Sequence, residues 1–351
     1  MTAPRTAEAA SGSGLNSPQG AAIALTAGAD HVPMRLDQFV AAALAPEYSR
    51  AQAARMIKAG RVTINGAAAR AAATVRRGDR IVIAPASAPP ASMPRAAAPA
   101  IEVLFADAEI IVVNKPHGMA VHPSAGHPDA TVVDALLARF PELAAMAEPD
   151  GVMRPGIVHR LDLETSGVMV VARTPFARTA LGRQFKDRTV RKTYIAIVRG
   201  RLARDRVTIA KPIGRHPTER KRMSTRSRTP RDAVSHVTVI DRIAAAAAPA
   251  TLVRVRPETG RTHQIRVHLA SIGHPCLGDS LYGGKGATAD AAAASEFGRQ
   301  ALHALALALT HPRSLERREF VAPPPADFGA YLGARGVACD AAAIRRWIDL
   351  A

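Results

Sequence analysis

Residues 156–173, GIVHRLDLETSGVMVVAR, have the pattern of a strand, a polar turn and a second strand. The runs 156–158 and 168–172 are β-branched or small and apolar, as in buried strands, whereas HRLDLETSG between them is rich in turn formers. Asp162 is therefore expected at a strand end, in a loop held between two buried strands, which is a rigid mount for a reacting group. The local residues fit a structural role equally well, in which Asp162 forms an Asx turn or pairs with Arg160.

Two further polar groups stand near the ends of expected elements. Tyr194 lies near the start of the strand-like run VRKTYIAIVRG. Thr262 is a suitable N-cap for a helix whose apolar residues recur at helical spacing, and Arg266 falls in the first turns of that helix. These groups are candidates for a site shared with Asp162.

The size and charge of the chain limit its function. Its 351 residues, 48% of them hydrophobic, suffice for one sizeable domain and a smaller one. No apolar run approaches the roughly 18 to 20 residues of a spanning helix, and the N-terminal run AAIALTAGA follows Glu8 rather than a basic region. We therefore expect no membrane partner and no signal peptide. The net charge of +18 predicts a polyanionic partner, with nucleic acid the leading candidate and a compositional bias toward arginine the simpler alternative.

The cysteines and histidines argue against a disulfide framework and a metal site. Cys276 and Cys339 are far apart in sequence and give no zinc spacing, which fits the cytoplasm. The histidines that invite a metal hypothesis do not fall at the i, i+4 spacing that would bring two ligands onto one helix face. Because the chain also lacks a dinucleotide or phosphate-loop motif, we expect no cofactor and no metal.

The N-terminal third predicts a small domain between two weakly structured segments. Residues 1–33, rich in Ala, Ser and Gly, are expected to be a disordered extension. Residues 34–83 contain two helical patterns, the second starting near Ser49, and two short strands with a turn at Asn65-Gly66. This unit carries nine basic and three acidic residues. Residues 84–100 form a Pro and Ala linker.

The strings RLD, SR, IKAGRVTING and RRGDRI make residues 34–83 resemble the S-four type RNA-binding domain, a small α/β module. In that family the two helices and the following turn lie along the RNA backbone. The resemblance therefore implies RNA contacts for Arg35, Arg50, Lys58 and Arg61.

Residues 101–334 are expected to form the main domain, followed by a C-terminal tail over 335–351. Two apolar strands open this domain, and a helix is expected over 131–140. The stretch 211–231 carries eight Lys or Arg and one Glu, which favours an RNA-facing loop over a merely solvated one. Residues 286–298 have the composition of an Ala-rich insertion, and RQALHALALAL after them predicts a buried helix or strand.

Four strings in this domain resemble the RluA/RluD-type RNA pseudouridine synthases: HRLDLETSG, RKTYIAIV, GRTHQIRVHLASIGHPCLGDSLYGG and RQALHALALALTHP. The resemblance covers about residues 34–333. It implies an α+β fold, in which a mixed, mainly antiparallel sheet with flanking helices follows the RNA-binding domain. It also implies an enzyme that converts uridine in RNA to pseudouridine without a cofactor.

The resemblance implies a role for each candidate residue. Asp162 would be the catalytic carboxylate, and Arg266 would pair with it and keep it ionised. Tyr194 would pack on the flipped base and take the proton from C5, with a core aromatic as the alternative. Arg160 would help to hold the flipped nucleotide, with a simple phosphate contact as the alternative.

The strings PIGRHPTERKRM and AVHPSAGHPDATVVDALLARFP resemble the RluD branch most, which implies a large-subunit (23S) ribosomal RNA substrate. Leu163 and Glu164 depart from the usual Lys or Arg and Asp, so the RNA position is less specified than the reaction. The alternatives are the same reaction on another rRNA or tRNA site, and a catalytically idle ribosome-assembly factor. The sequence pattern does not require more than a monomer.

Overall fold

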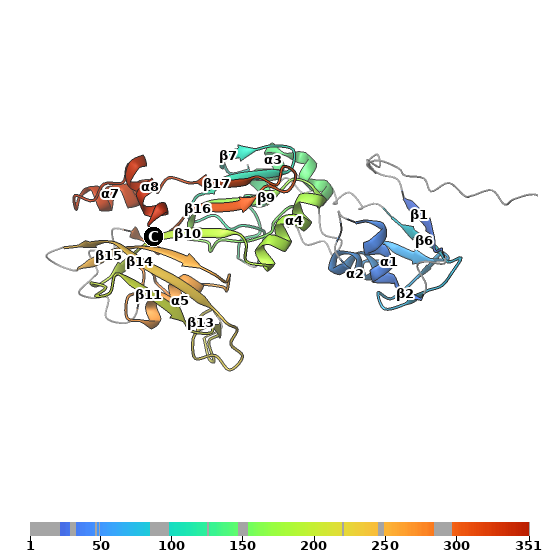
Figure 1. Cartoon of the computed structure of the whole chain (residues 1–351), viewed down its shortest axis with the longest axis horizontal. Helices are drawn as coiled ribbons and strands as arrows, with labels where there is room; N and C mark the ends of the chain where they lie inside the picture. The colour runs from blue at the N-terminus through green and yellow to red at the C-terminus, as the bar shows by residue number, and fades with distance from the viewer. Residues whose placement is uncertain are drawn as a thin grey trace, which may run out of the picture. The chain divides into compact units, whose positions relative to one another are not determined.

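The computed structural model describes residues 22–28, 33–45, 48, 50–84, 98–124, 126–146, 154–219, 221–244, 249–283 and 297–350. These residues belong to two compact units, one holding residues 22–84 and the other residues 98–350 (Figure 1). The predicted N-cap Ser49 and most of the linker and of the 286–298 insertion lie outside the described residues.

The N-terminal unit packs two helices on a small antiparallel sheet. Helices α1 (Leu36–Ala43) and α2 (Arg50–Lys58) share a core with the strands, built around the fully buried Leu36, Val40 and Ile81. The sheet has the order β1-β6-β3-β4, and a separate strand pair, β2-β5, contacts α1. Its strands are β1 (Ile23–Thr26), β2 (Met34–Arg35), β3 (Val62–Ile64), β4 (Ala67–Ala68), β5 (Thr74–Val75) and β6 (Arg80–Ile83).

Strand β1 corrects the prediction that residues 1–33 are a disordered extension. Ile23–Thr26 pairs antiparallel with β6 along its whole length. The segment as a whole has few large apolar residues, but Ile23 and Leu25 pack on the core of this unit and the edge of β6 supplies main-chain hydrogen bonds.

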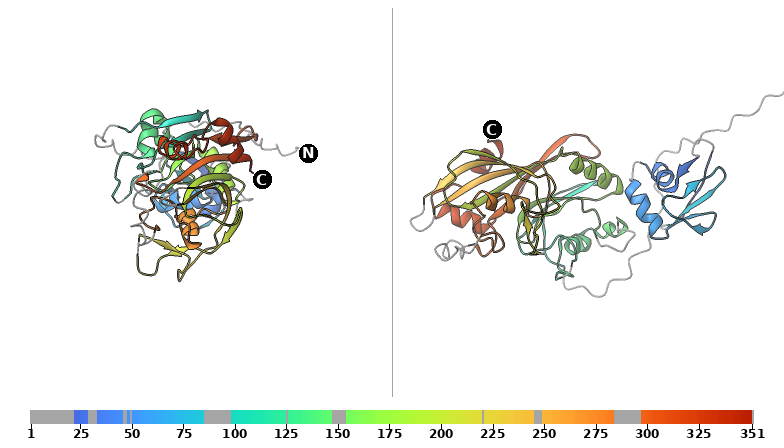
Figure 2. Two further views of the ribbon diagram at one scale, coloured as in Figure 1. Left: turned by 90° about the vertical axis from the view of Figure 1, so that its left-hand side faces the viewer. Right: turned by 90° about the horizontal axis from the view of Figure 1, so that it is seen from below.

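The C-terminal unit is built on the mixed, mainly antiparallel sheet that was expected (Figure 1, Figure 2). Its nine strands follow the order β11-β14-β15-β10-β16-β9-β8-β7, with β17 also paired to β16, and within the described residues only β16 and β9 pair in parallel. The strands are β7 (Glu102–Ala106), β8 (Ile110–Lys115), β9 (Ser166–Ala172), β10 (Arg191–Arg199), β11 (Arg206–Ala210), β14 (Val234–Ile243), β15 (Ala250–Pro257), β16 (Leu302–Thr310) and β17 (Arg317–Val321). The helices are α3 (Val132–Arg139), the 3-10 helix η2 (Pro141–Met146), α4 (Pro175–Lys186), α5 (Gln264–Ser271), α7 (Ala326–Gly333) and α8 (Ala341–Asp349).

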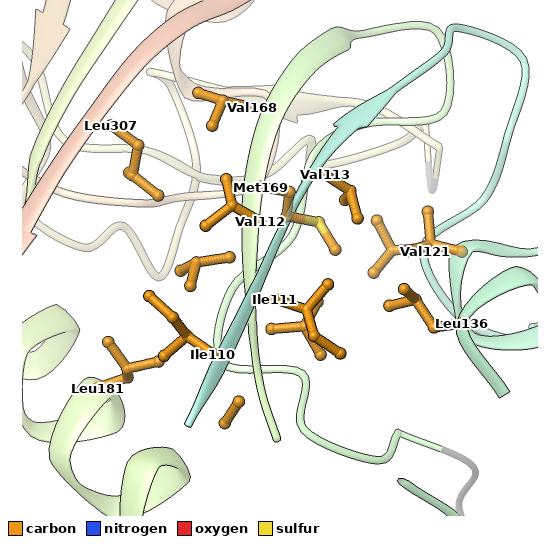
Figure 3. Packing of buried hydrophobic residues seen from close by; sticks show 14 of the residues in the cluster. Ile110, Ile111, Val112, Val113, Val121, Leu136, Val168, Met169, Leu181 and Leu307 are labelled. Atoms are coloured by element: carbon orange, nitrogen blue, oxygen red, sulfur yellow. The ribbon is translucent and has the colours of Figure 1, made fainter. Parts of the chain in front are cut away.

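Alternation along the strands divides the core among helices on opposite faces. On β8, Ile110 and Val112 point toward α4, whereas Ile111 and Val113 point toward α3 (Figure 3). On β10, Ile195 and its alternate neighbours pack with α7 and α8, and the residues between them pack with α5. Both faces are therefore covered, which explains why β9 is buried at every position.

A β-bulge interrupts the pairing of β10 with β16. Thr193 pairs with Ala306 and Tyr194 pairs with Ala304, so Leu305 is the extra residue. Leu305 and Ala306 consequently pack in the same core cluster, whereas Ala304 and Leu307 belong to the cluster beside β8 and β9.

The C-terminal segment 335–351, expected as a tail, contains helix α8 instead. Asp340 caps this helix by accepting the N–H of Ala343 at 2.7 Å, and Trp347 is buried against the cluster that includes β10. Two arginines of β15 donate to carbonyls at the end of α8. Nη2 of Arg256 lies 2.5 Å from the carbonyl oxygen of Ile348, and Arg254 donates to the same oxygen. The indole and these donors anchor a segment that is too short to predict a core element from periodicity alone.

Candidate active site

The loop carrying Asp162 is held by a single bridge and a histidine rather than by two full strands. Strand β9 forms as predicted, but the run 156–158 contributes only an isolated bridge between Ile157 and Val171. Gly156 has a φ of 69°, outside the strand region, and it lies so close to Ala172, whose N–H it accepts at 2.9 Å, that only a residue without a Cβ fits there. His159 continues the attachment, because its Nε2 accepts the N–H of Val170 at 3.0 Å. Burial lowers the pKa of His159 to about 3, so the ring is neutral and remains an acceptor.

Lys115 anchors the same loop from the end of β8. Its Nζ donates to the carbonyls of Pro116, Met119 and Leu163 at 2.8–2.9 Å, and its side chain is fully buried. The carbonyl of Leu163 also accepts the N–H of Gly118. Burial lowers the pKa of Lys115 to about 7, against the attraction of Asp162. Sequence reasoning did not select Lys115, although a charged residue ending the apolar run IIVVNK is a usable signal.

Asp162 lies beside Arg266, as the resemblance led us to expect. Nη1 of Arg266 is 3.2 Å from Oδ2 of Asp162. The Asp162 side chain is 19% exposed and that of Arg266 is 5% exposed. The carboxylate is thus open on one side and paired on the other. The loop itself turns at Asp162, whose carbonyl accepts the N–H of Thr165.

A second carboxylate, Asp279, fixes the arginine. Its two oxygens accept Nε and Nη2 of Arg266 at 2.7 and 2.9 Å, and its side chain is fully buried. Burial alone would lower the pKa of Arg266, but the hydrogen bonds and charges of Asp279 and Asp162 raise it. The bidentate contact orients the guanidinium, so that one remaining N–H points to Asp162. Asp279 lies within GHPCLGDSLYGG, from which sequence reasoning took no site residue.

Helix α5 brings Arg266 to this position, but it begins differently from the prediction. Thr262 does not cap it: the N-cap is His263, which has a φ of 54° and makes no capping hydrogen bond through its side chain. Gln264 stabilises the turn instead, because its Oε1 accepts the hydroxyl of Thr259 and the N–H of Arg261. The left-handed residue turns the chain sharply at the pocket, so that His263 also lines it.

Tyr194 lies on β10 opposite the β-bulge of β16. The pairing of the two strands shifts its register between Thr193 and Tyr194. Tyr194 is half-buried and lines the same pocket as Asp162. Burial, and then the charge of Asp162, raise the pKa of Tyr194 above its ordinary value. The hydroxyl is therefore protonated at neutral pH, which disfavours the predicted role of Tyr194 as the base that takes the C5 proton.

Arg160 is exposed and forms no ion pair with Asp162 within the described part of the chain, so the local alternative of an Arg160–Asp162 pair is wrong. It lines a pocket of about 480 Å³ together with Asp162, Tyr194 and Arg266. A pocket of this size fits a small molecule or one nucleoside. The cations Lys186 and Lys192 lie among the other lining residues.

Of the four predicted RNA contacts of the N-terminal unit, Arg35, Arg50 and Lys58 have exposed side chains, whereas Arg61 is bound to the main chain. Arg35 and Arg50 both lie 3.1 Å from carboxylate oxygens of Asp37, yet their side chains stay 46% and 51% exposed. Arg61 donates to the carbonyl of Ala84, which gives it a structural task. Lys58 is exposed at the end of α2.

The stretch 211–231 contains a short hairpin, β12 (Gly214–Arg215) with β13 (Met223–Ser224). We call the described residues of this stretch, 211–219 and 221–231, the basic hairpin. Lys221, Arg226 and Arg228 are exposed on it, whereas Arg222 pairs with Glu219. The structure thus allows the predicted RNA-facing role.

The described residues offer neither a metal centre nor a membrane-spanning helix. No group of three or more His, Cys, Asp or Glu side chains in this part of the chain is arranged to hold a metal ion. Likewise, none of its helices has the length and apolar character needed to cross a membrane.

Comparison with known proteins gives the family. Residues 109–271 match the family model described as RNA pseudouridylate synthase, and residues 34–81 match the S4 domain. A "Ribosomal large subunit pseudouridine synthase D" of Xanthomonas campestris pv. campestris is 43% identical over 306 residues, covering 84% of this chain and 87% of the relative. The chain belongs to the RNA pseudouridine synthase family. It is an isomerase with an N-terminal S4 domain, as the sequence predicted.

Other relatives of the synthase agree with this assignment. An "Uncharacterized RNA pseudouridine synthase YlyB" of Bacillus subtilis is 39% identical over 306 residues, covering 87% of this chain and 95% of the relative. Among solved structures, "Human RNA Pseudouridylate Synthase Domain Containing 1" is 30% identical with a TM-score of 0.53, covering 66% of the synthase and 87% of that chain.

Proposed function

We propose that the synthase converts specific uridines of large-subunit ribosomal RNA to pseudouridine, with Asp162 as the catalytic carboxylate acting on a flipped-out base. The observation that carries the proposal is the Asp162–Arg266 pair, 3.2 Å apart, in a pocket also lined by Tyr194 and Arg160. The substrate class is supported by the names of relatives such as the Xanthomonas protein. The cytoplasm is the proposed location, because the ribosome is assembled there.

The reaction breaks the bond between N1 of uracil and C1′ of ribose and joins C5 to the same C1′. The proton on C5 is lost and N1 gains one, so no redox partner is consumed. Asp162 serves in its ionised form whether it attacks C1′, adds to the uracil ring or assists formation of a glycal. Arg266 stabilises that ionised form and holds one carboxylate oxygen in place, which leaves the exposed side of Asp162 free to meet the nucleotide.

The other pocket residues hold the nucleotide in this proposal. Flipping is required because the reacting atoms of a stacked uridine are not accessible. Tyr194 presents an aromatic ring, with its hydroxyl protonated, on which the base packs. Arg160 provides an exposed cation for the displaced backbone or the former partner base. Lys58 and the exposed arginines of the S4 domain bind the backbone elsewhere on the RNA.

The test is to map pseudouridine in ribosomal RNA from three strains: the wild type, a strain in which the gene is deleted, and the deletion strain that expresses the Asp162→Ala variant. We expect one or more large-subunit positions to lose the modification on deletion, and Asp162→Ala to restore none of them. Asp187→Ala is the matched control, because Asp187 is a surface carboxylate paired with Arg183 at the end of α4.

Each part of the proposal has its own contradicting result. Restoration by Asp162→Ala would overturn the role of the carboxylate. A change confined to transfer RNA or the small subunit would overturn the substrate, and no change in any RNA would favour an idle assembly factor.

A further inference from the structure

Tyr282 lies between the basic hairpin and the catalytic pair. The residue is only 7% exposed. On one side the guanidinium of Arg222, in the hairpin, lies 5.5 Å from the ring centroid. The guanidinium of Arg266 lies 5.1 Å from the same centroid. One aromatic ring therefore contacts both the proposed RNA-binding hairpin and the arginine that holds Asp162.

The hydroxyl of Tyr282 repeats this link through hydrogen bonds. It accepts the N–H of Met223 in β13 at 2.9 Å, and it lies 2.8 Å from Nδ1 of His263. Burial lowers the pKa of His263, so its neutral ring can accept a hydrogen bond from the phenol. The hydroxyl can thus donate to a pocket residue while its oxygen accepts the N–H of the hairpin.

The backbone of Tyr282 is fixed by the carboxylate that fixes Arg266. Its N–H donates to Oδ1 of Asp279 at 3.1 Å, and the same oxygen accepts Nη2 of Arg266 at 2.9 Å. The tyrosine therefore cannot move relative to Arg266 without breaking a buried, charge-assisted contact.

We propose that Tyr282 is a positioning residue that fastens the basic hairpin to the Asp162–Arg266 pair. RNA held by the hairpin is then kept in register with the pocket, so the order of the hairpin is established before RNA binds. This inference rests on the proposed function, since it gives the hairpin an RNA to hold.

The test uses Tyr282→Phe in the full-length protein, which removes the hydroxyl and keeps the ring over both arginines. Tyr331→Phe is the matched control, because Tyr331 is a buried tyrosine of α7 that is not among the residues lining the pocket. Hydrogen exchange at the amide of Met223 reports the fastening directly. Steady-state kinetics on an unmodified large-subunit RNA transcript report KM and kcat separately.

We expect Tyr282→Phe to speed exchange at Met223 at least about tenfold and to raise KM about fivefold, the equivalent of one hydrogen bond of about 1 kcal/mol. We expect kcat to stay within about twofold, because Asp279 still holds Arg266. A merely structural role would instead lower the melting temperature and the active fraction, which reduces kcat and leaves KM unchanged.

A second pair of variants tests whether the effect passes through the hairpin. Arg226 is an exposed hairpin residue, and Arg226→Ala should raise KM in the wild-type background. In the Tyr282→Phe background the same change should raise KM by less than half as much, because a loosened hairpin no longer presents Arg226 in register.

Three outcomes would overturn the inference: unchanged exchange at Met223, an unchanged KM, or effects of the two substitutions that simply multiply. Failure of the proposed function gives a different result. In that case the wild-type protein forms no pseudouridine in the transcript, while exchange at Met223 still shows whether Tyr282 fastens the hairpin.

Discussion

Arg266 is shared by two carboxylates that differ in environment. Asp279 is fully buried and binds the guanidinium through two hydrogen bonds, whereas Asp162 is 19% exposed and receives one. The buried partner thus supplies most of the orientation, and the exposed partner is the one that the proposed reaction uses. Two residues of the same type consequently have different tasks, set by burial and hydrogen bonding alone.

The pH dependence of stability should depend on Lys115. Its folded-state pKa of about 7 is lower than the ordinary value of 10.5, so the unfolded chain binds more protons between these values and stability rises with pH. From pH 7 to pH 9, the free energy of unfolding of the wild type should rise by about 2 kcal/mol relative to Lys115→Met. Urea unfolding at both pH values measures the difference.

The surface variant Lys221→Met is the control for this comparison, because it removes a lysine of the same type at an exposed position. Equal profiles for the wild type and Lys115→Met would mean that the three carbonyls keep Lys115 charged throughout this range.

At the scale of elements, the sequence was most informative where strands are long and buried. The runs that became β8, β9 and β10 were predicted as strands, and α3 was expected from its helical spacing, whereas the run that became β16 was predicted only to be a buried helix or strand. Strand β1 was missed because its apolar run is short, and pairing with β6 together with packing of Ile23 and Leu25 on the core is what orders it.

The candidate site was only partly readable for a related reason. Asp162, Tyr194 and Arg266 were found because they stand in recognisable strings. Lys115 and Asp279 were not, since their importance comes from partners that the fold brings to them: Leu163, 48 residues away, for the lysine and Arg266, 13 residues away, for the aspartate. Burial of a charged group is a property of the folded chain, and a single sequence does not display it.

The junction of β9 with β16 should tolerate no side chain at Gly167. This residue has a φ of 119°, and a Cβ would lie 2.2 Å from the carbonyl oxygen of Ala304. Gly167→Ala should therefore lower the free energy of unfolding by about 3 kcal/mol or more. Gly182→Ala in α4 should raise it by about 0.5–1 kcal/mol, because a Cβ there has open space.

Urea unfolding of the two glycine variants at one pH provides the measurement. If Gly167→Ala were as stable as the wild type, the parallel pairing of β9 with β16 would not be as close as the structure shows. A destabilised Gly182→Ala would instead indicate that the helix interior does not follow ordinary propensity.

At the scale of the whole molecule, the proposed function divides the work of RNA binding between the two units. The N-terminal unit has its own core, so it does not need the sheet of the C-terminal unit to bury its apolar residues. In the proposed function, its exposed cations and those of the basic hairpin are two sets of contacts for the RNA backbone. Binding through two linked surfaces raises the effective concentration of RNA at the pocket.

Removing residues 1–90 should therefore weaken RNA binding without unfolding the C-terminal unit. The slope of log K against log salt should become shallower by about 0.7–0.9 for each phosphate group that the truncated protein no longer neutralises. Filter binding over a salt series measures the slope, and thermal unfolding of the truncated protein checks its fold. A truncated protein that is unfolded, or a slope that does not change, would contradict the division described here.

The bulge at Leu305 makes the length of β16 as important as its composition. The residues before and after the bulge are out of phase, so Ala304 and Leu307 reach one core while Leu305 and Ala306 reach the other. Deleting Leu305 would restore an unbroken ladder with the same pairs on either side, Ala304 with Tyr194 and Ala306 with Thr193, but it would remove a fully buried leucine and the local bend that the bulge gives the strand. The residue count of β16 therefore matters at the pocket as well as in the core, because Tyr194 stands opposite the bulge and lines the pocket.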